Sequence, residues 1–439
     1  MKKNKKLLRS LIAIVLAFLL VGSIVPTMAY AEDLVDSEVK TEIEEHVSFI
    51  ESMFNDLKDF IQKIIDFIKN LFNCKGNTDV PDEPTVPEVP DEPEAPNEPE
   101  VPDEPVVPEV PVEPEVPAIS DTAEFLAAIK NAEDGDVIAL AGGTYDIVGD
   151  NDFAQNTSLL LIEKSITIKA ADPANKPILL LATSNGTGTV KKLVHGIEIK
   201  SDNVKLENLI LKVAEGKTCT GNLIQISYKS NDPVEFYKDI VISGCELYGS
   251  EHSIALYGEN ITIENCILDE SEADKQGIII YVWSTRGTLT IKGNSLIGKD
   301  QKKHGISFYA QDSKACIIEG KINIEGNTFE DVYKPIVHEG VMTYNNVSVT
   351  IDNNVFKNYL KKPIAIDNGT FVDYNVTNNV FYMPSSVSDP FIENKTGFEV
   401  NANDNFWGTD SPVKSTIFKG AVSADRYFTD VEKTVTATW

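Results

Sequence analysis

One eight-residue phrase recurs along the second half of the chain and constrains its fold more than any other feature. Each copy has alternating apolar residues, a polar pair and two further residues, and successive copies lie about 21 to 37 residues apart: VKLENLIL from Val204, IVISGCEL from Ile240, ITIENCIL from Ile261, LTIKGNSL from Leu289, INIEGNTF from Ile322, VTIDNNVF from Val349, YNVTNNVF from Tyr374 and VNANDNFW from Val400. Strands this short cannot bury an apolar face alone, so the repeat predicts coils stacked on one another.

The polar pair of each phrase predicts a bend, because Asn and Gly tolerate left-handed backbone angles. Side chains at the bends are expected to stack as an amide ladder, with Cys245 and Cys266 taking the same place in two coils. The predicted members are Asn208, Asn294, Asn327, Asn354, Asn379 and Asn405.

A second repeated segment precedes each phrase. Its copies align without gaps as HSIALY, QGIIIY, HGISFY, KPIVHE, KPIAID and DPFIEN, and predict an inward ladder of Ile254, Ile278, Ile306, Ile336, Ile364 and Phe391. Alternation then places one residue of each copy outward in a stripe with rungs about 4.8 Å apart. The stripe comprises Tyr257, Tyr281, Tyr309, Glu339, Asp367 and Asn394.

A capped helix is predicted before the repeats, within SDTAEFLAAIKNAEDGD from Ser120. Asp121 is the expected cap, Glu124 reaches back to it, and Phe125, Leu126 and Ile129 form the apolar face.

From this helix to Trp439 the chain resembles the right-handed parallel β-helix proteins with the pectate-lyase-like fold. The resemblance rests on the stacked phrases, on DGDVIALAGGTYDI and KSITIKAADPANKPIL after the helix, and on the closing NDNFWGTDSP. It implies an all-β domain over residues 119–439, a right-handed parallel β-helix with an N-terminal capping helix. This fold serves lyases, hydrolases, epimerases and noncatalytic adhesins, so it does not select a function.

Three segments precede this domain, which we call the head. Residues 1–31 read as a signal peptide, with basic residues, an apolar run and the cleavage motif AYA ending at Ala31. Residues 32–74 carry a heptad pattern that predicts a coiled-coil-like helical segment, with homo-oligomerisation through residues 39–72 or packing on the same chain as alternatives. In residues 75–118 every third residue of a long acidic tract is proline, which predicts an extended polyproline II linker.

Charge and cysteine content exclude several classes of function. A formal net charge of −29 disfavours nucleic acid as a partner, and no apolar segment after the signal peptide is long enough to insert into a membrane. The five cysteines fit neither a zinc site nor a disulfide framework, so most are expected to be buried thiols. No cofactor and no metal site are predicted.

A polysaccharide lyase acting on an acidic glycan remains an open hypothesis. Such an enzyme needs a Lys or Arg base, and calcium or a basic group to neutralise the substrate carboxylate. Arg286, expected in a loop beside the stripe, Lys334 and Lys362 are the candidate bases, and Glu339 and Asp367 come nearest to a calcium-binding pair. However, the chain lacks the RxPxxR-like run of pectate lyases. His338 falls at an inward position and is expected to be a core histidine.

The favoured hypothesis is a binding protein, an adhesin or glycan-binding head on a spacer. Tyr257, Tyr281 and Tyr309, with Trp283 close by, would give a flat aromatic surface for sugar C–H faces, followed by the carboxylates Glu339 and Asp367 for sugar hydroxyls. The alternative is that the tyrosines only stack on one another. The expected partner is a polysaccharide or a host or cell-surface glycan, and the expected location is extracellular or at the cell wall. A structural envelope protein is a third hypothesis.

Overall fold

The computed structural model describes residues 116–148, 158–182, 194–217, 219, 221–231, 234–250, 252–271, 277–298, 303–310, 316–383 and 389–439. The chain divides into two units, Met1–Val107 and Pro108–Trp439, and all described residues belong to the second. The predicted signal peptide, helical segment and almost all of the linker lie outside the described residues and stay predictions. No helix within the described ranges is both long enough and apolar enough to span a membrane.

A short helix opens the head. α3 (Thr122–Asn131) is capped by Asp121, whose Oδ1 accepts a hydrogen bond from the backbone N–H of Glu124 at 2.9 Å, so the predicted cap is confirmed. Phe125 is fully buried and packs edge-to-face on Tyr145. Leu126 was expected on the buried face, but it is 40% exposed, because the helix covers the head only through a narrow apolar strip.

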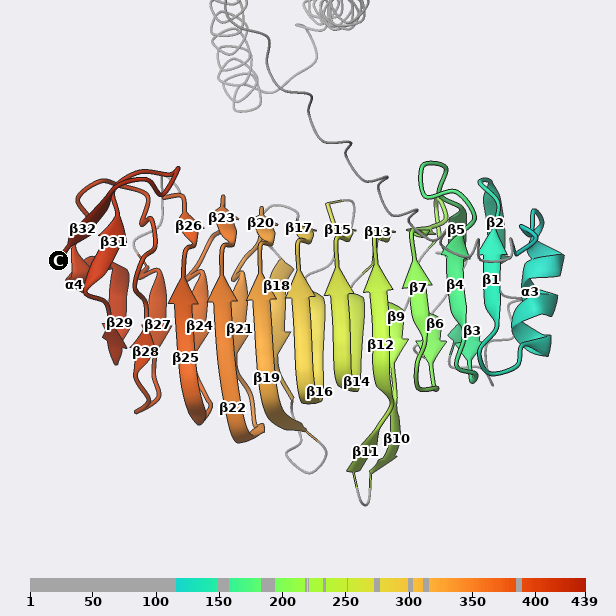
Figure 1. Cartoon of the computed structure of the whole chain (residues 1–439), viewed down its shortest axis with the longest axis horizontal. Helices are drawn as coiled ribbons and strands as arrows, with labels where there is room; N and C mark the ends of the chain where they lie inside the picture. Colours follow the sequence, from blue (N-terminus) through green and yellow to red (C-terminus); the bar gives the residue numbers. More distant parts are fainter. Residues whose placement is uncertain are drawn as a thin grey trace, which may run out of the picture. The chain divides into compact units, whose positions relative to one another are not determined.

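Parallel strands wind through the head in three faces (Figure 1). The first face consists of β1 (Val137–Leu140), β4 (Thr167–Ala170), β7 (Lys205–Glu207), β12 (Lys238–Ser243), the later part of β14 (His252–Glu264) and of β16 (Gly277–Lys292), β19 (Ile317–Glu325), β22 (Thr343–Asp352), β25 (Phe371–Thr377), β28 (Val400–Asn401) and β30 (Val422–Ser423).

The second face shares β14 and β16 with the first, so both faces belong to one 19-stranded sheet. It consists of β3 (Ser158–Ile162), β6 (His195–Ile199), β9 (Asn222–Ile226), the early part of β14 and of β16, β18 (Lys303–Phe308), β21 (Ile336–His338), β24 (Ile364–Ile366), β27 (Ile392–Asn394) and β29 (Phe418–Gly420).

The third face is a separate nine-stranded parallel sheet. It consists of β2 (Thr144–Val148), β5 (Ile178–Ala182), β8 (Ile210–Val213), β13 (Glu246–Tyr248), β15 (Ile267–Asp269), β17 (Ser295–Ile297), β20 (Thr328–Glu330), β23 (Val355–Lys357) and β26 (Val380–Phe381). The remaining elements are the antiparallel pairs β10 (Tyr228–Asn231) with β11 (Val234–Phe236) and β31 (Arg426–Phe428) with β32 (Thr436–Thr438), and the short helix α4 (Lys414–Ile417).

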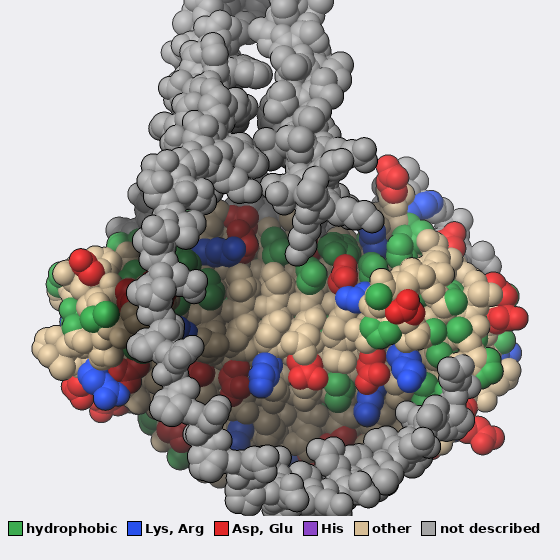
Figure 2. Space-filling view, turned by 45° about the horizontal axis from the view of Figure 1, so that its top comes forward, with side chains coloured by type: hydrophobic (Ala, Val, Ile, Leu, Met, Phe, Trp, Pro, Cys, Tyr) green, Lys and Arg blue, Asp and Glu red, His purple; other side chains and the backbone are tan. Residues whose placement is uncertain are grey.

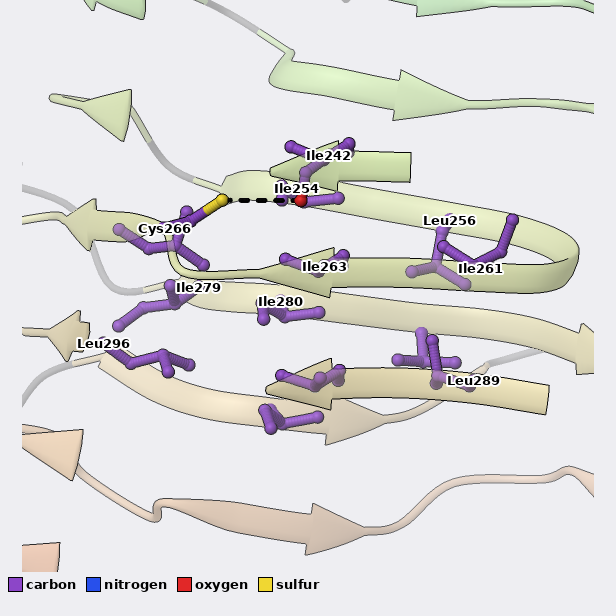
Figure 3. Close-up of a cluster of buried hydrophobic side chains, with 14 of the residues drawn as sticks. Ile242, Ile254, Leu256, Ile261, Ile263, Cys266, Ile279, Ile280, Leu289 and Leu296 are labelled. Atoms are coloured by element: carbon purple, nitrogen blue, oxygen red, sulfur yellow. Dashed lines mark hydrogen bonds between the residues drawn. The ribbon is translucent and has the colours of Figure 1, made fainter. Parts of the chain in front are cut away.

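Side chains from all three faces fill the space inside the coils. Across three successive coils, Ile242 and Ile263 come from the first face, Ile254 and Ile280 from the second and Leu296 from the third, and their side chains lie together (Figure 3). Four of the five cysteines are described, and Cys219, Cys245, Cys266 and Cys316 are buried free thiols, as predicted.

The bends between the first and third faces carry the predicted amide ladder. The side-chain Nδ2 of Asn294, Asn327, Asn354 and Asn379 each lies 2.9–3.0 Å from Oδ1 of the asparagine in the next coil, and the ladder ends at Asn405. Cys266 continues it, because its backbone N–H donates to Asn294 Oδ1 at 2.9 Å.

Asn208 is not a member of this ladder. It has φ of 57° and occupies the left-handed position taken by Gly244 and Asn265 in the next coils, so its neighbour Leu209 fills the ladder position. Asn208 therefore lies one residue before the ladder position that was predicted for it.

The inward ladder differs from the predicted one at two rungs. Its paired members are Ile197, Ile224, Ile254, Ile280, Ile306, Ile336, Ile364 and Ile392, so Ile280 replaces Ile278, and Ile392 replaces Phe391. The two-residue slip at Ile280 leaves the in–out alternation unchanged, and three consecutive isoleucines made it invisible in the sequence. The one-residue shift at Ile392 reverses the alternation, so Asn394 points inward. The slip decides which side chains share an outward column.

Candidate functional site

Outward side chains of the second face stand in three columns. The first column holds the residue two before each ladder isoleucine: His195, Asn222, His252, Ile278, His304, Lys334, Lys362 and Pro390. The middle column holds the residue one after it: Glu198, Gln225, Ala255, Tyr281, Ser307, Val337, Ala365 and Glu393. The last column holds the residue three after it: Lys200, Ser227, Tyr257, Trp283, Tyr309, Glu339, Asp367 and Lys395.

The predicted stripe is therefore divided between columns. Tyr281 stands in the middle column, where it pairs with Ala255 and Ser307. Trp283 has the same spacing from its ladder isoleucine as Tyr257 and Tyr309, and it lies at a bulge of β16, because Tyr257 pairs with Ser284. Asn394 was expected outward but is buried, and its Nδ2 donates to the backbone oxygen of Ala421 at 2.9 Å.

A pocket of about 380 Å³ opens on this face between β6, β9, β14 and β16. It is lined by His195, Gly221, Asn222, Gln225, Ser227, Tyr228, His252, Tyr257, Tyr281 and Trp283.

Aromatic rings form a continuous wall of the pocket. The ring centroids of Trp283 lie 4.7 Å from Tyr281 and 5.4 Å from Tyr257, and Tyr257 meets Tyr228 at 5.1 Å. Tyr281 also lies 6.1 Å from Tyr309. The predicted aromatic residues are thus brought together. Burial raises the pKa of both Tyr257 and Tyr281, so their hydroxyls stay protonated.

Polar groups on the opposite side of the pocket are held by hydrogen bonds. The amide Nδ2 of Asn222 donates to Gln225 Oε1 at 2.7 Å, and Gln225 Nε2 donates to the backbone oxygen of Ile226 at 2.8 Å. The backbone N–H of Asn222 donates to Nδ1 of His195 at 3.1 Å. Burial lowers the pKa of His195, so its imidazole is neutral near pH 7.

Beyond Tyr309 the same face becomes charged. Glu339 lies 3.6 Å from Lys334 and 3.7 Å from His304, across the middle column. Asp367 pairs with Lys395 at 2.9 Å. Glu339 and Asp367 thus take the predicted outward positions, each beside a lysine.

Glu393 anchors a second group of charges at the end of the middle column. It pairs with Lys362 and, at 2.6 Å, with Lys419. Burial raises the pKa of Glu393, but the hydrogen bonds from Lys362 and Lys419 outweigh it and lower the pKa to about 2.

The three candidate bases of the lyase hypothesis are all engaged with carboxylates. Arg286 was expected in a loop, but it lies within β16, where its Nε donates to Glu319 at 3.2 Å and its guanidinium covers the ring of Phe236. Lys334 and Lys362 pair with Glu339 and Glu393. Within the described ranges, no group of three or more His, Cys, Asp or Glu side chains is placed to hold a metal ion.

The side of the pocket formed by His195, Asn222 and Gln225 was not predicted from the sequence. The segment HGIEIK from His195 has the pattern of HGISFY from His304, and extending the alignment two coils towards the N-terminus would have found it. His252 begins β14, and the backbone N–H of Ile278 donates to its Nδ1 at 3.0 Å.

Comparisons with known proteins agree with this architecture. Residues 195–381 match a family described as a right handed beta helix region. Together with the parallel winding of the strands, this match shows that the head contains a right-handed parallel β-helix. No match was found among curated proteins.

Several solved structures are similar in fold to this chain. An alginate lyase from Paenibacillus sp. str. FPU-7 is 15% identical, with 70% of this chain and 98% of that chain covered and a TM-score of 0.44. A tailspike protein double mutant of E. coli bacteriophage HK620 in complex with pentasaccharide is 12% identical, with 71% and 62% covered and a TM-score of 0.42. The A-module of a mannuronan C-5 epimerase from Azotobacter vinelandii is 12% identical, with 70% and 94% covered and a TM-score of 0.37. At these identities the likeness concerns the fold alone.

Proposed function

We propose that the head binds a glycan through the pocket on its second face, and that the chain is an exported or surface-associated binding protein. The observation that carries the proposal is the joining of an aromatic wall, Tyr257–Trp283–Tyr281, to a polar wall held by Asn222 and Gln225. Sugar rings present both C–H faces and hydroxyls, so a pocket with these two walls suits them.

Binding is favoured over catalysis by what lines the pocket. No Asp, Glu, Lys or Arg is among the described residues of the lining. Glycoside hydrolysis ordinarily uses two carboxylates beside the scissile bond, and elimination from a uronate needs a base with a cation or basic group nearby. The pocket offers polar and aromatic contacts instead.

The arrangement of the full sequence supports a displayed binding module. The signal peptide over residues 1–31 would export the chain, and the acidic proline tract would hold the head away from the segment over residues 32–74. Oligomerisation through residues 39–72 would present several heads together and raise avidity. Light scattering of the secreted chain tests this part, and a monomer would refute it.

Retention on a glycan array tests the binding proposal. The Trp283→Ala variant removes the ring that touches both Tyr257 and Tyr281, so its retention should fall at least tenfold. Tyr382→Ala is the matched control, because Tyr382 is a 44% exposed aromatic residue just after β26 on the third face. Equal retention by the wild type and Trp283→Ala would show that the pocket is not the binding site.

A further inference from the structure

We infer that the glycan bound in this pocket is uncharged. The inference rests on the proposed function and names the class of ligand within it. Three observations support it: the donors and acceptors that the pocket presents, the pairing of the nearby lysines with carboxylates, and the free-energy cost of burying an acidic sugar there.

In the polar wall, His195 and Asn222 present one donor beside one acceptor. Nδ1 of His195 accepts from the backbone N–H of Asn222, so in the neutral imidazole the proton sits on Nε2, which is a donor. The amide of Asn222 is oriented by its donation to Gln225, so Oδ1 is its acceptor, and no described residue donates to that oxygen. A sugar hydroxyl both donates and accepts, and it matches such a pair. A carboxylate only accepts, and Oδ1 of Asn222 would repel it.

Every lysine in the three columns already has a carboxylate partner. Nζ lies within 4.0 Å of a carboxylate oxygen in each case: Lys200 with Glu198, Lys334 with Glu339, Lys362 with Glu393, and Lys395 with Asp367 and Glu393. Glu393 and Glu198 are almost fully buried, so these pairs belong to the packed surface of the face. A ligand carboxylate could gain a lysine here only by displacing an internal carboxylate.

Figure 2 shows the same mixing of charge on the face that it presents, where Lys and Arg side chains lie among Asp and Glu side chains rather than in one basic patch. A uronate entering the aromatic pocket would lose hydration without gaining a counter-charge, which is costly. The net charge of −29 adds long-range repulsion. An uncharged sugar avoids both the uncompensated loss of ionic hydration and the repulsion, and it can still stack on Trp283.

Calorimetric titration of the purified full chain with defined oligosaccharides tests the inference. The uncharged probes are cello-, manno-, xylo- and chito-oligosaccharides, and the acidic probes are oligogalacturonate and oligomannuronate. We expect at least one uncharged probe to bind, with an affinity that changes less than twofold between about 20 mM and about 500 mM salt. Asn222→Ala and Trp283→Ala should each weaken it at least tenfold, and Tyr382→Ala should not.

The other outcomes separate the two levels of the proposal. Binding of an acidic probe alone, with affinity falling steeply as salt rises, would overturn the inference and leave the glycan-binding function standing. Binding of an uncharged probe that neither pocket variant weakens would place the site elsewhere and overturn both. Failure of every probe to bind, with a chain that melts cooperatively, would also overturn both.

Discussion

The rings of Phe308 and His338 stack face to face inside the coils, with centroids 4.4 Å apart and planes 2° from parallel. His338 is fully buried, and the hydroxyls of Tyr344 and Tyr374 each lie 3.2 Å from one of its ring nitrogens. The prediction of a core histidine is therefore confirmed. An imidazole enclosed by aromatic rings has no counter-charge, and burial lowers its pKa to about 3.

This histidine should make the stability of the head depend on pH. The folded-state pKa lies below the unfolded value of about 6.5, so the unfolded chain binds the proton more readily between these values. Above about pH 6.5, titration of His338 does not change the free energy of unfolding. Below that pH, it lowers the free energy of unfolding by about 1.4 kcal/mol for each pH unit.

Urea unfolding of the wild type and of His338→Gln between pH 7 and pH 4 checks this. The variant should be less stable at pH 7, because it loses the stack on Phe308, but its stability should fall less steeply with acid. His304, whose pKa is lowered to about 4 chiefly by burial, is present in both proteins, so the difference between the slopes isolates His338. Parallel slopes would contradict the assignment.

Asn354 stands in the middle of the amide ladder, and its replacement should be costly. Its Nδ2 donates to the backbone oxygen of Ile324 at 2.8 Å, and its Oδ1 accepts from the backbone N–H of Asn327 at 2.9 Å. Asn354→Ala would leave these buried groups unpaired, and we expect a loss of about 3 kcal/mol in the free energy of unfolding.

The adjacent Asn353 supplies the control for this experiment. It has φ of 54°, and the equivalent position in two earlier coils is Gly293 and Gly326. Asn353→Gly should change the free energy of unfolding by about 0.5 kcal/mol or less, because glycine adopts this backbone angle freely. If the two variants were equally destabilised, backbone geometry rather than the ladder bonds would explain the loss at Asn354.

The residues that the sequence placed well and those it misplaced differ in a physical way. Positions that only a few residue types can occupy were predicted correctly: the buried amides from Asn294 to Asn405, Asn265 with its left-handed backbone, and the inward His338. Register within an apolar run was not, because Ile278 and Ile280 satisfy the same in–out alternation. The aromatic wall was therefore predicted with the right residues in the wrong columns.

Contacts between different coils were beyond the sequence analysis. Lys303, at the start of β18, has a fully buried side chain that pairs with Glu270, which follows β15 one coil earlier. Nothing in the residues flanking either one marks a partner, since the pairing depends on loop geometry. The same limit hid the ion pairs of Arg286 and Lys362.

The buried pair Lys303–Glu270 should behave as one unit. Nζ of Lys303 lies 3.6 Å from Glu270 Oε2 and donates to the backbone oxygen of Ser250 at 3.0 Å, while Ser253 Oγ donates to Glu270 Oε1 at 2.5 Å. Lys303→Met would leave the Glu270 carboxylate buried without this cation, so it should cost about 3–5 kcal/mol. Glu270→Gln removes the carboxylate that faces the Lys303 ammonium and should also be destabilising.

A double-mutant cycle checks this coupling. Lys303→Met combined with Glu270→Gln should cost less than the sum of the single variants by at least about 1 kcal/mol. The exposed pair Lys357–Glu330, whose charged atoms lie 2.7 Å apart on the third face, is the control and should couple by no more than about 1 kcal/mol. Additive costs at Lys303 and Glu270 would mean that the two side chains contribute separately.

The engagement of Arg286, Lys334 and Lys362 with carboxylates leads to a prediction about elimination chemistry. A lyase base must reach the proton on the carbon beside the uronate carboxylate, and it must be unprotonated to accept that proton. Arg286 faces Glu319 and Phe236, away from the pocket lining, and Lys362 is held by Glu393. We therefore expect no rise in ultraviolet absorbance from an unsaturated product when the chain is incubated with uronic-acid polysaccharides and calcium.

An absorbance rise that Arg286→Ala or Lys362→Met abolished would instead identify a lyase. In that case the pocket lined by Trp283 would be a substrate subsite, and Trp283→Ala should raise KM more than it lowers kcat.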